Sequence, residues 1–450
     1  MRADDRLQDP PGHTQLLPCF SSLAQRTADA PIKIPETLPA RSPQSPQYRF
    51  SDTSIYPHLE TNIHVSSMSF SLEPMPEART AWSISQHGAD TPFRHWSVVQ
   101  AYISGLLSRN NYDSFVTYNT TVERVHKAPK SEAWTLTLRK PLEDFKEDYW
   151  WNEDFDAVVV ASGHYNVPYV PHIPGLDAFA AAHPGVVMHS KAFRDPSAYK
   201  DKRVIIVGAS VSGGDLSSAL ASTVAAPLYS VVRGKYHHLF SDWPFQHPRI
   251  VRKMGISHFV PDGSGTVVFA DGTSVSKPDA VIFATGYSWN LPFVPEIEVR
   301  NNRVPHLYQH IFHIPDPTLC FVGAVAAGFT FKIFEWQAVA AARFLAGRAE
   351  LPARNEMEKW ERDRMEEKGD GVPFTIIAPD FEEYFDGIKQ WAGEPFRAED
   401  GTMVGRSLPH FEKAWWDEFD DGVQRRIEMF QRINADTVGS DASESIQTID

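Results

Sequence analysis

A strand that runs into a glycine-rich turn and then a helix constrains the fold of this chain more than any other feature. Residues 204–207 form a continuous apolar run, and the turn after them reads Gly-Ala-Ser-Val-Ser-Gly from Gly208 to Gly213. This is the dinucleotide-binding pattern G-x-G-x-x-G with Ser210 at the second glycine. Gly208 allows the tight turn, and Gly213 lets the helix pack on the strand. Ser210 and Ser212 are small enough for the backbone to approach a pyrophosphate, which the first N–H groups of the helix would bind. The pattern predicts a nucleotide site, with a purely structural turn as the alternative.

The next apolar run, residues 228–232, indicates which nucleotide to expect. An NAD site places Asp or Glu about 20 residues further on, where it binds the ribose hydroxyls. Arg233 stands twenty residues after Gly213, and residues 233–253 hold five basic side chains against one acidic side chain. A guanidinium suits the 2′-phosphate of NADP. We therefore predict NADPH rather than NADH, and solvated surface charge is the alternative.

Three apolar runs that end at a glycine indicate an α/β fold with a parallel sheet. They cover residues 155–163, 203–208 and 279–286. Buried parallel strands are apolar on both faces, which separates them from the alternating strands of a hairpin. Alternating runs at 116–125 and 134–138 predict a hairpin or a meander, and Asp-Gly at 271–272 predicts the turn of a hairpin. Helical patterns cover residues 96–107, 334–345, 355–368, 380–391 and 411–433.

Composition excludes several function classes. The 450 residues carry 43 basic and 57 acidic side chains, a net charge of −14, which argues against a general nucleic-acid binder. No apolar run approaches the roughly 18 residues of a membrane span, and the N-terminus lacks the apolar core of a signal peptide. The two cysteines, Cys19 and Cys320, predict no disulfide framework, so we expect a cytoplasmic location without a membrane anchor. Eight prolines before residue 47 predict an irregular segment over 1–47.

Metal and hydrolase chemistry are not expected. His237, His238 and His247 lack a carboxylate or a third ligand at helical spacing, so we predict no metal site. The glycine turn also fails the nucleophile pattern G-x-S-x-G, because Ser212 stands where the second glycine is needed.

Further motifs around the glycine turn follow the order known from one enzyme family. Residues 183–193 match three of the four fixed positions of F-x-G-x-x-x-H-x-x-x-[FY], with His183 in place of the phenylalanine. Residues 283–287 read Phe-Ala-Thr-Gly-Tyr, residues 59–62 read Leu-Glu-Thr-Asn, and residues 319–323 read Leu-Cys-Phe-Val-Gly. Over roughly residues 50–350 the chain resembles the flavin-containing monooxygenases in their fungal form.

The resemblance implies two cofactors, FAD and NADPH, and assigns residues to them. It places Asn62 near the reactive face of the flavin, as the catalytic candidate, with Thr61 beside it among the cofactor-binding residues. Thr285 and Gly286 lie where the chain crosses back towards the flavin domain. Gln337 belongs to the segment that is expected to close over the isoalloxazine.

The resemblance also implies a reaction. NADPH reduces FAD, the reduced flavin binds O2 as a C4a-hydroperoxide, and one oxygen passes to a nucleophilic nitrogen or sulfur of a small molecule. The cofactors carry such a reaction, while the protein orients them and excludes water. Fungal relatives further imply a role in natural-product biosynthesis. Baeyer–Villiger oxidation of a ketone is an alternative with the same cofactors, and a flavin-less remnant that only binds NADPH is another. The sequence gives no indication of the oligomeric state.

The chain departs from the family pattern at its start. The implied fold has two Rossmann-like dinucleotide-binding domains, with an NADPH domain at 196–289 inserted into a flavin domain made from 48–195 and 290–450. In the family that flavin domain begins with a βαβ unit carrying G-x-G-x-x-G, but the only glycine in residues 1–87 is Gly12. We therefore expect the first βαβ unit to be missing. A wrongly annotated 5′ end, a variant that binds FAD weakly or through another chain, and the loss of flavin chemistry are the three explanations.

The arginine after the second strand of the nucleotide domain provides a test of cofactor choice. Replacing Arg233 by alanine removes the guanidinium expected at the 2′-phosphate, and a hydrogen bond to a charged group contributes about 1.5–3 kcal/mol. We expect Arg233→Ala to weaken NADPH binding about tenfold or more while NADH binding stays the same. Titration of both nucleotides by fluorescence measures this, and equal, unchanged affinities would contradict the assignment.

Overall fold

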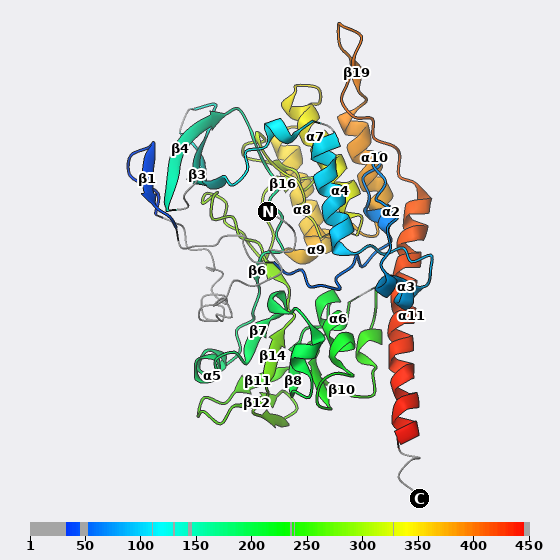
Figure 1. The fold of residues 1–450 in the computed structure, drawn as a ribbon. Coiled ribbons are helices and arrows are strands. Elements are labelled where there is room, and N and C mark those ends of the chain that lie inside the picture. Colours follow the sequence, from blue (N-terminus) through cyan, green and yellow to red (C-terminus); the bar gives the residue numbers. More distant parts are fainter. Residues whose placement is uncertain are drawn as a thin grey trace, which may run out of the picture.

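The computed structural model describes residues 33–45, 53–109, 111–128, 131–142, 146–234, 236–237, 239–326 and 328–444. Cys19, His238 and most of the proline-rich segment 1–47 lie outside the described residues. The described chain forms a lower body around a parallel sheet and an upper body rich in helices, as Figure 1 shows.

A five-stranded parallel sheet forms the centre of the lower body. Its strand order is β10-β9-β8-β14-β7, and every neighbouring pair is parallel. The strands are β7 Val187–His189, β8 Val204–Val207, β9 Leu228–Val231, β10 Ile250–Lys253 and β14 Ala280–Phe283. All residues of β8 and β14 are buried, which confirms two of the predicted parallel strands. Strand β7 precedes residue 196, where the NADPH domain was predicted to start, and the domain boundaries stay a prediction.

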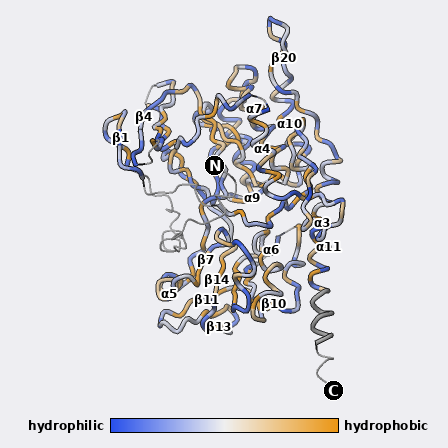
Figure 2. Tube along the Cα trace, in the orientation of Figure 1, coloured by the Kyte–Doolittle hydropathy of each residue, from blue (hydrophilic) through white to orange (hydrophobic). Residues whose placement is uncertain are grey.

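The two faces of this sheet are covered by different elements. Helix α6, Val211–Leu220, packs Leu216 and Leu220 on the face that carries Val204 and Ile282. Alternate strand residues point to the opposite face, towards helix α5 and a small antiparallel sheet. These elements are α5 Leu176–Ala182, β11 Ile256–Phe259, β12 Thr266–Phe269 and β13 Ser274–Ser276. Strands β12 and β13 form the predicted Asp-Gly hairpin. Hydrophobic residues mark the strands in Figure 2.

A second sheet, in the upper body, contains one parallel pair. Its order is β16-β17-β18-β5, and only β18 and β5 run parallel. The strands are β5 Val158–Val160, β16 Leu307–Tyr308, β17 Phe312–His313 and β18 Leu319–Phe321. The strand predicted over 155–163 is therefore shorter than expected. Phe155 instead ends the neighbouring strand β4, where it pairs with Trp134.

An antiparallel sheet at the edge of the upper body includes the predicted hairpin. Its order is β1-β4-β3-β2, with β1 Ala40–Pro43, β2 Thr121–Lys127, β3 Trp134–Pro141 and β4 Glu147–Phe155. Strands β2 and β3 confirm the hairpin. Strand β1 lies within the segment 1–47 that was predicted to be largely irregular. Its backbone pairs with Glu147–Trp150 of β4, a long-range contact that local sequence does not reveal.

Helices fill the rest of the upper body around an aromatic core that contains Trp336, Phe329 and Phe385. The helices are α2 Val65–Met68, α3 Ala81–His87, α4 Trp96–Arg109, α7 Thr330–Leu345, α8 Arg354–Lys368, α9 Val372–Thr375, α10 Phe381–Ala392 and α11 Lys413–Glu444. The five predicted helices are confirmed within this set. Helix α11 is the longest, and it runs from the upper body down beside α6 (Figure 1).

Short elements complete the description. They are β6 Val167–Pro168, β15 Tyr287–Ser288, β19 Phe396–Arg397, β20 Met403–Val404, and 3-10 turns at Asp113–Phe115, Ser190–Ala192, Pro196–Tyr199 and Trp243–Phe245. Strands β6 and β15 pair antiparallel where the chain passes between the two bodies. Among the described helices, none combines the length and apolarity needed to cross a bilayer.

Candidate nucleotide and flavin site

The glycine turn after β8 is held against the end of β14. Gly208 has φ +133°, and a Cβ added to it would lie 2.3 Å from the carbonyl oxygen of Ala284. Its N–H donates to the carbonyl oxygen of Val231 at 3.0 Å. Only glycine can adopt this backbone conformation at such a close approach. The turn therefore joins the carboxyl ends of three neighbouring strands, β8, β9 and β14.

Helix α6 starts directly from this turn with its N-terminus unblocked. Ser210 is the N-cap residue, but its side chain makes no capping hydrogen bond. A Cβ on Gly213 would lie 2.2 Å from the carbonyl oxygen of Gly208, so the helix sits tightly on the turn. Ser212 lies in the first turn and is partly exposed. The first N–H groups of a helix have no partner within it, and here they are free to bind an anion. These residues fit a nucleotide pyrophosphate.

Arg233 is the remaining candidate for a 2′-phosphate. It is exposed at the end of β9 and makes no hydrogen bond or ion pair with a described residue. The other described basic residues of this segment are engaged elsewhere. Arg252 pairs with Asp242 at 3.0 Å, and Lys253 pairs with Asp271 at 2.8 Å. Arg233 is therefore the described basic residue of this segment that is left for the 2′-phosphate, and this role stays a prediction.

The segment after β14 is fixed by hydrogen bonds to the chain that crosses between the bodies. The Thr285 hydroxyl donates to the carbonyl oxygen of Tyr169. The carbonyl oxygen of Gly286 accepts from the Tyr169 N–H at 2.8 Å and from Nε2 of His189 at 2.9 Å. Thr285 and Gly286 therefore lie at the same edge of the sheet as the glycine turn.

His189 holds this crossing as a neutral ring. It is fully buried, and its Nδ1 accepts from the Lys191 N–H at 3.1 Å while Nε2–H donates to Gly286. Burial lowers the pKa of His189 to about 4. These contacts give His189, the histidine of the 183–193 motif, a structural role.

A second histidine ties the linker after β5 to the second sheet. His164 stacks on Trp289 with ring centroids 4.4 Å apart. Burial lowers its pKa to about 4, and a backbone hydrogen bond with Gly323, after β18, opposes that shift. The ends of β5 and β18 are thereby held next to the crossing segment.

The residues assigned to the flavin have different environments. The Asn62 side chain is partly buried and makes no hydrogen bond with a described residue, so it is available to a ligand. Thr61 is buried, and its hydroxyl bonds within the chain, to the Ile63 carbonyl oxygen at 3.3 Å and the Arg94 N–H at 3.1 Å. Gln337 is fully buried, and its amide oxygen accepts from the Gly323 N–H at 2.8 Å. Gln337 contacts the turn at Gly323. Its role in cofactor binding stays a prediction.

The described residues do not form a cradle for the ADP half of FAD. In the usual doubly wound order 3-2-1-4-5, the fourth strand lies between the first and the fifth. Here β5 pairs with β18 on one side, and no described strand pairs with its other edge. Val159 in β5 is 45% exposed, although parallel strands are normally covered on both faces. The described chain fits the nicotinamide nucleotide and lacks the diphosphate site of the flavin.

Sequence reasoning missed an ion pair beside the glycine turn. Asp215, two residues after Gly213, pairs with Arg426 of α11. Burial raises the pKa of Asp215, and Arg426 opposes that shift. An acidic residue directly after a glycine turn was the available signal, but its partner is 211 residues away. No group of metal-ligating side chains lies together among the described residues.

Comparison with known proteins identifies the family. A family model described as FMO-like, flavin-binding monooxygenase-like, matches residues 50–243 and 250–394. The chain belongs to this family. Flavin-containing monooxygenase ustF2 from Aspergillus flavus is 27% identical over 461 residues, covering 91% of this chain and 90% of the relative. Trimethylamine monooxygenase from Methylocella silvestris is 30% identical over 358 residues, covering 72% and 75%.

Solved structures agree with the family and the fold. The structure of S-allyl-L-cysteine S-oxygenase from Allium sativum superposes with a TM-score of 0.67 at 26% identity, covering 88% of this chain and 85% of that one. The flavin-binding monooxygenase family uses FAD and NADPH. The α/β architecture with Rossmann-type folds is thus confirmed.

Tight packing at the start of α6 generates a prediction about nucleotide affinity. A methyl group in Gly213→Ala would push the helix away from Gly208, and overpacking of this kind costs about 1–3 kcal/mol. We expect NADPH binding to weaken about tenfold or more, as measured by fluorescence titration. Gly387→Ala is the matched control, because a Cβ there meets nothing within 4 Å. Unchanged affinity in Gly213→Ala would show that the nucleotide does not bind at this turn.

The buried histidine predicts a loss of stability in acid. Unfolded histidine binds a proton near pH 6.5, whereas His189 in the folded chain does so near pH 4. The unfolded state binds more protons between these values, so the contribution of the neutral ring is complete above about pH 6.5 and is lost as pH falls to about 4, by about 1.4 kcal/mol for each pH unit. We expect His189→Gln to reduce this pH dependence in urea unfolding.

His410 provides the control for that measurement, because its side chain is 76% exposed. His410→Gln is expected to keep the pH profile of the unmodified chain. The same slope in all three proteins would contradict the role given to His189.

Proposed function

We propose that this family member uses NADPH and FAD to transfer one oxygen atom of O2 to a nucleophilic nitrogen or sulfur of a small molecule. The observation that carries the proposal is the anion-binding turn from Gly208 to Gly213 within a chain that matches the family over 50–243 and 250–394. Trimethylamine monooxygenase and S-allyl-L-cysteine S-oxygenase, named for nitrogen and sulfur compounds, support this substrate class.

The residues of this chain contribute binding and orientation. The first turn of α6 binds the pyrophosphate of NADPH, and Arg233 binds its 2′-phosphate. Asn62 offers a free amide to the nicotinamide or the substrate. The buried contacts of His189 and Gln337 fix the backbone of Gly286 and Gly323 around that position. When bound, FAD accepts a hydride from NADPH and activates O2.

Activity depends on whether the 450-residue chain holds FAD, so the first experiment is its visible spectrum before and after FAD is added and the excess removed. The proposal requires a bound-flavin spectrum that NADPH bleaches, which would show that FAD binds although the described residues do not form its diphosphate site. A colourless protein that binds NADPH would contradict the proposal and favour the NADPH-binding remnant.

Isotope labelling then tests oxygen transfer. Under 18O2, we expect one labelled oxygen in the product of trimethylamine or a thioether, detected by mass spectrometry. Label found only in a lactone or ester made from a ketone would favour Baeyer–Villiger oxidation instead.

Asn62 is tested in the same assay. Asn62→Ala is expected to lower the product formed per NADPH consumed by about tenfold, the loss of one aligned hydrogen bond. Asn355→Ala on the exposed face of α8 is the matched control. An unchanged product yield in Asn62→Ala would remove this residue from the site.

A further inference from the structure

A short stretch of chain after β9 contacts both the glycine turn and helix α6. The His237 N–H donates to the carbonyl oxygen of Ala209, inside the turn, at 3.2 Å. Pro244 packs on the start of α6, since a Cβ added to Gly214 would lie 3.0 Å from Cβ and Cγ of Pro244. We call residues 239–245 the covering segment. A shift of this segment would loosen the elements that are proposed to bind the pyrophosphate.

Helix α11 holds the covering segment through one stripe of side chains. Arg426, Phe430 and Asn434 are spaced four residues apart, so they lie on one face of the helix. The Arg426 guanidinium lies 5.8 Å from the centre of the Phe240 ring, and Phe430 meets the same ring edge-on with centroids 5.9 Å apart. Nδ2 of Asn434 donates to the carbonyl oxygen of Trp243 at 3.0 Å. Consecutive turns of α11 therefore contact the covering segment.

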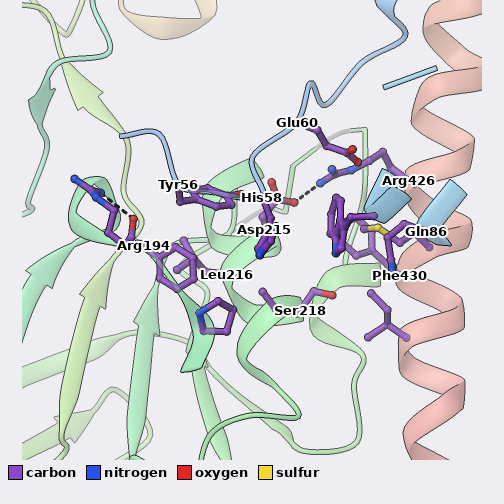
Figure 3. Close-up of a pocket in the computed structure, with 16 residues that line it drawn as sticks. Tyr56, His58, Glu60, Gln86, Arg194, Asp215, Leu216, Ser218, Arg426 and Phe430 are labelled. Carbon is purple, nitrogen blue, oxygen red and sulfur yellow. Dashed lines mark hydrogen bonds and ion pairs between the residues drawn. The ribbon is translucent and has the colours of Figure 1, made fainter. Parts of the chain in front are cut away.

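Arg426 also connects α11 to α6 directly. Its side chain is only 7% exposed, and it forms the ion pair with Asp215 that Figure 3 draws as a dashed line. A cavity of about 280 Å³, lined by residues of both helices, lies beside this pair. The pair therefore bridges a gap that side chains do not fill, and α6 depends on it for its position relative to α11.

The first residue of α6 is bound to the same group of side chains. Val211 packs against the aromatic core of the upper body, to which Phe240 and Phe430 belong. The start of α6, the covering segment and α11 thus form one packed unit around the glycine turn. Fixing such a unit before the nucleotide arrives lowers the entropy cost of binding.

We propose that Arg426 is a positioning residue for NADPH. Through Asp215 and Phe240 it holds α6 and the covering segment in the arrangement that binds the pyrophosphate. The inference rests on the proposed binding of NADPH at the glycine turn, and it adds a residue that lies 211 positions after Asp215 in the chain. Because NADPH and NADH share the pyrophosphate, both depend on Arg426, whereas Arg233 is expected to affect NADPH alone.

Fluorescence titration of both nucleotides with the full chain tests this role. Arg426→Gln removes the charge and keeps most of the side-chain volume, and we expect both NADPH and NADH to bind about fivefold or more weakly. Arg425→Gln is the matched control, because this neighbour on α11 pairs with Asp90 at 2.7 Å and Asp421 at 2.9 Å. It is expected to keep both affinities. Unchanged affinities in Arg426→Gln, or a loss confined to NADPH, would overturn the proposal.

A second variant avoids the buried charge, because Arg426→Gln leaves Asp215 without its charged partner and costs stability. Asn434→Ala removes only the hydrogen bond to the Trp243 carbonyl oxygen. We expect it to weaken the binding of both nucleotides about threefold, the loss of one neutral hydrogen bond. Gln424→Ala, which removes an amide from an exposed position of α11, is its matched control. If Arg426→Gln does not fold, equal affinities in Asn434→Ala and Gln424→Ala would overturn the proposal.

Thermal unfolding of the same variants separates positioning from stability. A purely structural role predicts a lower melting temperature for Arg426→Gln with unchanged nucleotide affinity in the folded protein, and that result would overturn the proposal. An unmodified chain that does not bind NADPH would contradict the proposed function and this inference with it. An unmodified chain that binds NADPH no more tightly than Arg426→Gln would overturn this inference alone.

Discussion

The close approach of the glycine turn to β14 is the contact on which the rest of the site depends. Gly208 leaves no room for a side chain against Ala284, and Gly213 leaves none against Gly208. The turn is therefore fixed by the sheet rather than by a ligand, and the N-terminus of α6 is presented before any nucleotide binds. Such preorganisation reduces the entropy that binding has to overcome.

The two bodies are joined at this same helix. Asp215 on α6 pairs with Arg426 on α11, while Arg425 of α11 reaches back to Asp90 near α3. Buried charge pairs contribute little net stability, but breaking one leaves a costly unpaired charge. The pair therefore fixes the position of α11 over the nucleotide domain more than it stabilises the fold.

The sequence predicted those elements that depend on residues close together in the chain. The apolar strands β8 and β14, the turn at Gly208 and the five helices follow from periodicity and glycine placement within a short window. Contacts between distant segments could not be predicted: β1 pairs with β4, Asp215 pairs with Arg426, and Gln337 is buried against Gly323. The basic segment after β9 is a further example. Arg252 pairs with Asp242 and Lys253 pairs with Asp271, and the sequence alone did not show these ion pairs.

The edge of β5 that no described strand pairs with has a consequence for the architecture. An unpaired strand edge presents N–H and C=O groups that can bond to any extended segment, and the exposed Val159 makes this edge apolar as well. An extended segment that pairs in parallel with this edge would therefore continue the described sheet by one strand. The strand on the flavin side of the fold is thus the place where the described sheet has room for a further strand.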